Sequence, residues 1–317
     1  MEISFSSAVN ELKNADNILI LTHINPDGDT LGSGYALLRA LRKLGKKARL
    51  INGDKISDKY AFLYEGIEQQ DFTASFIVSV DVAEIKLLGD TVGAAYGDKV
   101  NLAIDHHESS RRFAQKTYCE PDSASCCEII YLIIKELGVE FDSKIADCIY
   151  TGCSTDTGCF KYSNVTPRTH RIAAELIEKG ARHSKINEVM FDTKTMNNIM
   201  LERKCLESLE VFAGGKVAVI TVTQAMLNEC ETDKSALDAI KPLTRQIDGV
   251  EIGITVKEEK DGKTGVSIRS SENYDASAIC AHFGGGGHIR AAGCEMRDLS
   301  PMQVKEKVVD YILSSVL

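Results

Sequence analysis

Four short apolar runs in the first half of the chain alternate with helical patterns, and this alternation limits the possible folds more than any other feature. A helical pattern over residues 30–44 ends at Gly45 and separates the first two runs. Apolar strands joined by helices are typical of a parallel sheet with helices on both faces. We therefore predict an α/β fold whose strands lie in residues 17–22, 47–51, 75–80 and 100–104.

Acidic or imidazole side chains directly follow three of these runs. His23 follows the first run, Asp81 the third, and Asp105-His106-His107 the fourth. In open α/β sheets, ligands bind beyond the carboxyl ends of the strands. We therefore expect these side chains to meet at one edge of the sheet.

Three further acids belong with this set. Asp27 and Asp29 share a short loop with His23, and Pro26 and Gly28 make that loop turn sharply. Asp156 lies in a turn rich in glycine and threonine.

Carboxylates gathered so closely repel one another and could not all ionise, unless a cation neutralises them. Mixed carboxylate and imidazole ligation suits manganese, iron or zinc better than calcium. Two such ions at about 3.5–4 Å commonly serve phosphoryl hydrolysis. The alternative is that each acid only caps a helix, which Asp81 taken alone would favour. Convergence of five acids and three imidazoles favours ligation.

The second half of the chain restarts the pattern on a smaller scale. We interpret residues 188–198 as a linker between a domain over 1–187 and a smaller α/β domain over 199–317. Ser300-Pro301-Met302-Gln303 predicts the start of the last helix. The other predicted elements of this domain are helices over 199–212, 235–247 and 275–282 and strands over 216–222, 250–256 and 264–268.

A run of four glycines, Gly284 to Gly287, precedes His288. Consecutive glycines cost chain entropy, which is reasonable where backbone N–H groups must approach an anion closely. Arg269 and His288 could add charged donors to the same phosphate. A flexible turn is the alternative interpretation.

Composition limits which partners and which cellular compartment are expected for this protein. A net charge of −9 gives no overall basic field for long nucleic acid. The ten cysteines include no CxxC pair, which favours a cytoplasmic protein with reduced thiols. No apolar run approaches the roughly 20 residues of a membrane span, and the N-terminus lacks a signal peptide.

Taken together, the motifs resemble the DHH superfamily of phosphoesterases, which includes the RecJ-type exonucleases. His23-x-Asn25-Pro26-Asp27-x-Asp29 and Asp105-His106-His107, with Asp81 and Asp156, carry this resemblance. The second half is similar to the DHHA1 domain through Arg269-Ser270 and the segment from Gly284 to Gly293. The two-domain length is most similar to the stand-alone nanoRNase and pAp-phosphatase branch, the NrnA type.

The resemblance implies a role for each residue and an active site in the cleft between the domains. Asp105 would orient His106, and His107 would contact the scissile phosphate and assist the leaving oxygen, while a bridging water attacks. Two manganese ions are implied, with magnesium or cobalt as substitutes. Their ligands would be His23 and Asp27 for one, Asp29, His106 and Asp156 for the other, and Asp81 for both. The substrate would bind to Arg269, Ser270, Gly285, Gly286, Gly287 and His288.

The resemblance also implies the substrates. They would be short RNA oligonucleotides and linear dinucleotides, cleaved to mononucleotides, and 3′-phosphoadenosine 5′-phosphate. Long duplex nucleic acid and membranes are not expected as partners, and a homodimer is compatible with the pattern. The alternatives are a cyclic-dinucleotide phosphodiesterase, a RecJ-like single-strand exonuclease, a manganese pyrophosphatase and a non-catalytic nucleotide- or RNA-binding module. A module without catalysis would not need the full ligand set.

Overall fold

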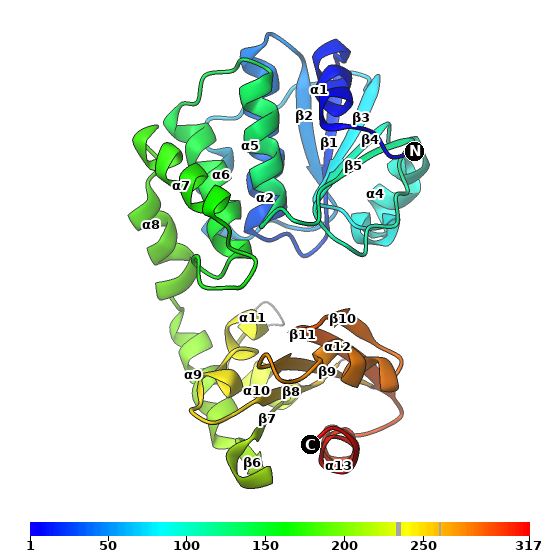
Figure 1. The fold of residues 1–317 in the computed structure, drawn as a ribbon, viewed down its shortest axis with the longest axis vertical. Coiled ribbons are helices and arrows are strands. Elements are labelled where there is room, and N and C mark those ends of the chain that lie inside the picture. Colours follow the sequence, from blue (N-terminus) through cyan, green and yellow to red (C-terminus); the bar gives the residue numbers. More distant parts are fainter. Residues whose placement is uncertain (233–235, 260) are drawn as a thin grey trace. The chain divides into compact units, whose positions relative to one another are not determined.

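A computed structural model describes residues 1–232, 236–259 and 261–317, which form two compact units (Figure 1). The units are Met1–Thr193 and Lys194–Leu317, and their boundary falls inside the predicted linker. Each unit has its own sheet and its own hydrophobic cores. The predicted domain limits and the cleft between the domains stay predictions.

The first unit is built on a five-stranded sheet in the order β2-β1-β3-β4-β5. Every neighbouring pair is parallel, as predicted. The fifth strand was not predicted, because its Lys-Thr-Tyr-Cys sequence alternates in polarity and has no apolar run. The strands are β1 (Ile18–Thr22), β2 (Ala48–Asn52), β3 (Phe76–Val80), β4 (Leu102–Asp105) and β5 (Lys116–Cys119).

Helices cover both faces of this sheet, as predicted. Alternate residues of β1 divide between two cores, with Ile18 and Ile20 on one face and Leu19 and Leu21 on the other. The first face packs against α2 (Gly28–Lys43), α5 (Cys126–Glu136) and α6 (Ser143–Asp156), and the second against α4 (Gly89–Tyr96). The remaining helices are α1 (Phe5–Asn14), α3 (Ala61–Tyr64), α7 (Pro167–Glu178), α8 (His183–Asn187), a π-helix (Glu188–Asp192) and 3₁₀ turns at Asp58–Tyr60, Ile85–Leu88 and Gly97–Lys99.

Three glycines let α2, α5 and α6 approach closely. A Cβ atom at Gly32 would lie 2.4 Å from the carbonyl oxygen of Cys148, and one at Gly28 would lie 2.4 Å from Thr155 Oγ1. A Cβ atom at Gly152 would lie 2.2 Å from Cys127 Sγ. These contacts bring the beginning of α2 close to the end of α6.

Two of the predicted site residues lie in helices rather than in the expected loops. Asp27 caps α2, because its Oδ1 accepts hydrogen bonds from the N–H groups of Asp29 and Thr30, so Asp29 lies in the first turn of α2. Asp156 is the last residue of α6. The turn predicted there begins only at Thr157.

The second unit has a six-stranded sheet in the order β10-β11-β9-β8-β7-β6. All neighbours are antiparallel except β7 and β8, which are parallel. One face packs against α12 and α13 and the other against α9, α10 and α11. The strands are β6 (Glu210–Phe212), β7 (Val217–Val222), β8 (Ile252–Glu258), β9 (Lys263–Ser270), β10 (Gly286–His288) and β11 (Ala291–Arg297).

In the C-terminal part of this unit the helices agree with the prediction, and in its N-terminal part they differ. The helix predicted over 199–212 ends at Glu207, and β6 follows it. Of the helix predicted over 235–247, Ser235 lies outside the described residues and the rest is interrupted before Pro242, which has no N–H to continue a helix. The helices are α9 (Met196–Glu207), α10 (Gln224–Glu229), α11 (Leu237–Ile240), α12 (Ala276–His282) and α13 (Pro301–Ser315), with 3₁₀ turns at Ala213–Gly215 and Leu243–Gln246.

Within residues 1–232, 236–259 and 261–317, no helix has both the length and the apolar character needed to cross a membrane.

Candidate metal centre

The side chains predicted to meet at the edge of the first sheet lie together in the structure. His23 follows β1, Asp81 follows β3 and Asp105 ends β4, and these three strands are neighbours. Potential ligand atoms lie within 4.8 Å of one another in three groups. The groups are His23, Asp27 and Asp81; Asp29, His106 and Asp156; and Asp81, His106 and His107.

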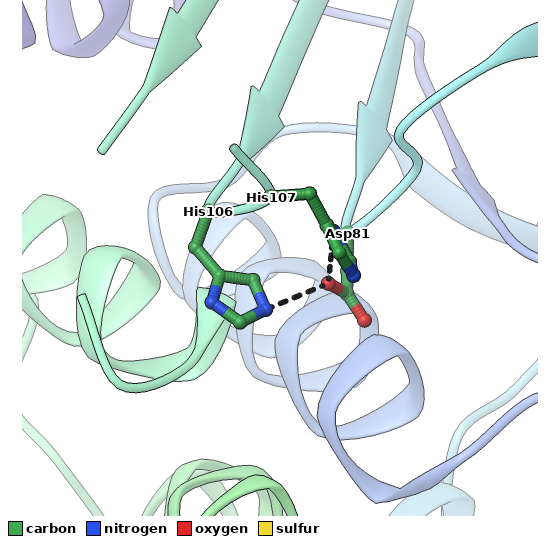
Figure 2. Close-up of side chains that lie close together, drawn as sticks. All are labelled: Asp81, His106 and His107. Carbon is green, nitrogen blue, oxygen red and sulfur yellow. Dashed lines mark ion pairs between the residues drawn. The ribbon is translucent and has the colours of Figure 1, made fainter. Parts of the chain in front are cut away.

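Asp81 lies between the first two groups. Its Oδ2 is 3.5 Å from His23 Nε2, and its Oδ1 is 3.5 Å from His106 Nε2 and 3.6 Å from His107 Nδ1. Figure 2 shows both imidazoles directed at Asp81 from the end of β4. Only 2% of Asp81 is exposed, and among the described residues its Oδ1 has no hydrogen-bond partner.

The separations between donor atoms fit a divalent cation. His23 Nε2 is 3.6 Å from Asp27 Oδ1, and His106 Nε2 is 3.3 Å from Asp156 Oδ2 and 3.7 Å from Asp29 Oδ2. These separations exceed the range of about 2.7–3.2 Å for N–H···O hydrogen bonds. Two ligands bound at about 2.0–2.2 Å to one ion lie about 3–3.5 Å apart. The buried, unpaired Asp81 Oδ1 and the mixed donors therefore suit a metal ion.

The start of α5 fixes the carboxylate of Asp29. Oδ2 accepts a hydrogen bond of 2.6 Å from the N–H of Cys126, and Oδ1 accepts one of 2.8 Å from the N–H of Cys127. These N–H groups belong to the first turn of α5, where unpaired donors and the helix dipole favour an anion. Sequence reasoning missed this contribution, although Ser125, the N-cap of α5, indicates where free N–H groups begin.

Backbone carbonyls orient the two imidazoles that face the acids. His23 Nδ1 lies 2.8 Å from the carbonyl oxygen of Ile24, and His106 Nδ1 lies 3.2 Å from that of Ser123. Because a carbonyl oxygen only accepts, each Nδ1 donates. Each Nε2 is then left facing the carboxylates, which is the usual arrangement for a metal-binding histidine.

Asp105 orients a different histidine from the one predicted. Its Oδ1 lies 2.8 Å from His107 Nδ1 and accepts a hydrogen bond from the backbone N–H of His106, but it does not contact the His106 ring. The prediction that Asp105 orients the His106 imidazole is therefore wrong. The physical reason is local, because an aspartate at a strand end readily accepts from the N–H groups that follow it, and this turns its carboxylate toward His107.

The charges of the groups are strongly interdependent. Burial disfavours a charged imidazole, but the Asp27 and Asp81 carboxylates outweigh it and raise the pKa of His23 to about 11. In the same way, Asp156, Asp29 and Asp81 outweigh burial and raise the pKa of His106 to about 11.

The crowded carboxylates disfavour one another's charged form, which also raises their pKa values. Burial and the nearby Asp81 and Asp156 raise the pKa of Asp29 well above its ordinary value. Burial is also the main cause that raises the pKa of Asp156 to about 6. A cation would relieve this crowding of acids, which is the electrostatic reason to expect one here.

The predicted substrate-binding residues of the second unit have well-defined backbone positions. Gly286–His288 forms the edge strand β10, paired with β11, so part of the glycine run is a strand and not a flexible turn. A Cβ atom at Gly285 would lie 2.2 Å from the carbonyl oxygen of Gly293, so packing excludes a side chain there. The Ser270 hydroxyl donates to the carbonyl of Tyr274, and Arg269 lies opposite Ala291 on β11. Contact of these residues with substrate stays a prediction.

Comparison with known proteins agrees with the resemblance. Residues 17–153 match the DHH family, N-terminal domain, and residues 214–315 match the DHHA1 domain. The chain is 30% identical over 304 residues to the bifunctional oligoribonuclease and PAP phosphatase NrnA of Thermus thermophilus, covering 93% of this chain and 89% of that protein.

Solved structures share the fold. An exopolyphosphatase-related protein from Bacteroides fragilis superposes with a TM-score of 0.86 at 23% identity, covering 97% of this chain and 96% of that one. RecJ of Thermus thermophilus, in complex with Mn²⁺, gives a TM-score of 0.60 at 13% identity, covering 98% of this chain and 54% of that one.

Proposed function

The chain belongs to the DHH family, with a DHHA1 domain in its second half, and we propose that it is a manganese-dependent phosphoesterase that hydrolyses short oligoribonucleotides by a two-metal mechanism. The relative from Thermus thermophilus is named as an oligoribonuclease and PAP phosphatase, which supports a hydrolase of this class.

The position of Asp81 is the observation that carries the proposal. One carboxylate oxygen faces His23 and the other faces His106, so a single side chain serves both donor groups. A carboxylate that faces both groups could be shared by two metal ions, one held by each group. We propose His23, Asp27 and Asp81 as ligands of one ion, and Asp29, His106, Asp156 and Asp81 as ligands of the other.

Manganese is the metal that we propose, with magnesium or cobalt as substitutes. The donor set mixes imidazoles with carboxylates, which favours manganese over calcium. The RecJ structure of the same fold is a manganese complex. When bound, two such ions supply a water of lowered pKa and neutralise charge on the reacting phosphate.

The chain's own residues position the substrate and move the proton. Asp105 holds Nδ1 of His107 at 2.8 Å, and the pKa of His107 is raised because the Asp105 and Asp81 carboxylates outweigh burial. We propose that His107, held by Asp105, donates a proton to the leaving oxygen. Asp29 and Asp27 stay in place through backbone N–H donors, so the acids do not have to reorganise during the reaction.

We propose RNAs of a few residues and linear dinucleotides as substrates, together with 3′-phosphoadenosine 5′-phosphate. The name of the Thermus thermophilus relative covers both activities, and the net charge of −9 disfavours long nucleic acid. Arg269, Ser270 and the segment from Gly285 to His288 are proposed to bind the phosphate or nucleoside of these substrates.

A single substrate panel tests the proposal. The full chain is incubated, with Mn²⁺ and separately with Mg²⁺, with dinucleotides, a five-residue RNA, 3′-phosphoadenosine 5′-phosphate, cyclic dinucleotides and pyrophosphate. We expect mononucleotides from the first two, AMP from the third, and higher rates with Mn²⁺. Faster cleavage of cyclic dinucleotides or of pyrophosphate would instead assign one of those activities, and binding without turnover of any substrate would make the chain a binding module.

A further inference from the structure

Arg168, near the start of α7, binds three side chains at once. Its Nη1 donates to Glu120 Oε1 at 2.6 Å, its Nε to Glu128 Oε2 at 3.0 Å and its Nη2 to Ser123 Oγ at 2.8 Å. Glu128 is fully buried. A planar guanidinium donates from three nitrogens in fixed directions, whereas the three donors of an ammonium group come from one freely rotating nitrogen.

The segment that Arg168 holds, residues 120–127, contributes backbone groups to the candidate metal centre. The carbonyl of Ser123 accepts from His106 Nδ1, and the N–H groups of Cys126 and Cys127 donate to Asp29. Residues 120–125 lie outside any helix or strand. Within this stretch the N–H of Glu120 donates to the carbonyl of Asp105 and the N–H of Ser123 donates to the carbonyl of Glu120. The side-chain contacts from Arg168 add to these two backbone hydrogen bonds.

A second side chain ties this segment to Asp156, which shares a donor group with Asp29 and His106. Nδ2 of Asn164 donates to the carbonyl of Ala124 at 3.0 Å and to the carbonyl of Asp156 at 3.2 Å. Asn164 and Arg168 lie on either side of Thr166, the N-cap of α7. The start of α7 therefore holds the segment from two points.

We propose that Arg168 is a positioning residue for the group formed by Asp29, His106 and Asp156. It holds segment 120–127 so that the Ser123 carbonyl fixes the His106 ring and the two N–H groups fix the Asp29 carboxylate. Within the part of the chain that the structure describes, the hydrogen bonds of Arg168 go to Glu120, Ser123 and Glu128 and not to a proposed ligand, so Arg168 acts through this segment. The inference rests on the proposed metal centre.

The test compares Arg168→Lys with the wild-type chain in calorimetric titrations with Mn²⁺. Lysine keeps the charge beside Glu128 but donates from a single nitrogen, so it cannot reproduce the three-nitrogen arrangement of the guanidinium. We expect the affinity for the ion at Asp29, His106 and Asp156 to fall about 10–100-fold. This is the usual effect of losing a partner that orients a ligand. The affinity for the ion at His23 and Asp27 should change less, and only through the Asp81 carboxylate that the two sites are proposed to share.

Arg182→Lys is the matched control. Arg182 also pairs with a buried carboxylate, that of Asp147, through its Nε at 2.8 Å, but it has no contact with segment 120–127. The Arg182→Lys variant should have a lower melting temperature and an unchanged Mn²⁺ affinity. If Arg168→Lys does not fold, Ser123→Ala is the second variant, because it removes only the hydroxyl that Arg168 binds. It should also lower the Mn²⁺ affinity of the site at Asp29, His106 and Asp156.

A second readout separates this inference from the proposed function. In the metal-free protein, ¹⁵N spectra of the imidazoles should show a shifted His106 Nδ1 signal in Arg168→Lys and an unchanged His23 signal. An unchanged His106 signal together with wild-type affinity for both ions would overturn the positioning role. A wild-type chain that binds no Mn²⁺, with the His106 shift still present in the variant, would overturn the metal centre and leave the role of Arg168 in orienting His106 supported.

Discussion

Asp81 is the residue on which both donor groups depend, and its backbone reflects this position. Its φ angle is 59°, in the left-handed region that aspartate and asparagine tolerate better than other side chains with a Cβ atom. Such conformations persist where the surrounding structure requires them, and they gather at functional sites.

Asp81→Asn should therefore abolish hydrolysis while keeping the backbone conformation. Because loss of an orienting partner already costs about 10–100-fold in metal affinity, loss of the shared ligand should cost at least about 100-fold. Mn²⁺ titration and turnover of a dinucleotide measure the two effects. Asp98→Asn, at an exposed acid, is the control. Near-normal turnover of Asp81→Asn with Mn²⁺ would exclude a shared ligand.

Asp105→Asn should separate catalysis from metal binding. The variant loses the carboxylate that orients His107, so we expect kcat to fall by about 100-fold or more, the contribution typical of a general acid. Mn²⁺ affinity should stay near the wild-type value. If the two residues act together, His107→Gln and the double variant should lose a similar amount, because effects within one unit are not additive. Fully additive losses would mean that they act independently.

Metal binding should release protons. The pKa of His23 and that of His106 are raised to about 11, so both imidazoles are charged at pH 6–8, and each must lose its proton to bind a cation. Apparent Mn²⁺ affinity should therefore rise with pH, by about tenfold per pH unit for each ion. Calorimetry at several pH values, in buffers of different ionisation enthalpy, measures this release. Affinity that is independent of pH between 6 and 8 would contradict it.

At the scale of single residues, the sequence predicted which side chains cluster, but not which imidazole Asp105 contacts. Short motifs at strand ends indicate which side chains converge, as for His23 and Asp81. They do not reveal which atom a carboxylate contacts, so Asp105 was assigned to the wrong ring. They also do not reveal backbone donors and acceptors such as the Ser123 carbonyl, because every residue carries these groups.

Among the elements, the pair α2 and α6 determines the spacing of the acids. Asp29 lies in the first turn of α2 and Asp156 at the end of α6, and glycines let the helices approach. A Cβ atom at Gly152 would lie 2.6 Å from Asp29 Oδ1 as well as 2.2 Å from Cys127 Sγ.

Gly152→Ala should therefore push these helices apart and weaken metal binding. Overpacking of this kind costs about 1–3 kcal/mol, so the melting temperature should fall together with Mn²⁺ affinity. Gly93→Ala is the matched control, because Gly93 lies in α4 and a Cβ atom there would meet nothing closer than 3.5 Å. A Gly152→Ala variant with wild-type affinity would show that helix spacing does not control the site.

Elements with strong apolar patterns were predictable, whereas those defined by their partners were not. The four apolar strands and the capped helix α13 agree with the sequence, since a cap such as Ser300 is a local signal. Strands β5 and β6 have only four and three residues, too few for a recognisable pattern, and each pairs with the edge of a neighbouring strand. Helical periodicity also continued beyond Glu207, where the chain instead pairs with β7.

At the scale of the whole molecule, the two units have separate cores. Buried residues of the first sheet and of the second sheet fall into different clusters, and the predicted metal ligands all belong to the first unit. Metal binding and substrate binding should therefore respond to different substitutions.

Arg269→Ala should raise KM for short RNA and leave Mn²⁺ affinity unchanged. Loss of a hydrogen bond to a charged group costs about 1.5–3 kcal/mol, which corresponds to a rise in KM of about 10–100-fold. Arg297→Ala, at the far end of β11 from the residue opposite Arg269, is the control. A KM that does not change for any short substrate would remove Arg269 from the substrate site.

The shared carboxylate of Asp81 has a consequence for the order in which the centre fills. Two ions that use opposite oxygens of one side chain cannot bind independently, because the first ion fixes the orientation of that side chain and takes up part of its negative charge. The coupling is reciprocal by linkage, so each ion changes the affinity of the other by the same factor. Binding of the two ions should therefore show positive or negative cooperativity. Activity should then rise with the free cation concentration more steeply, or less steeply, than it would for a single binding site.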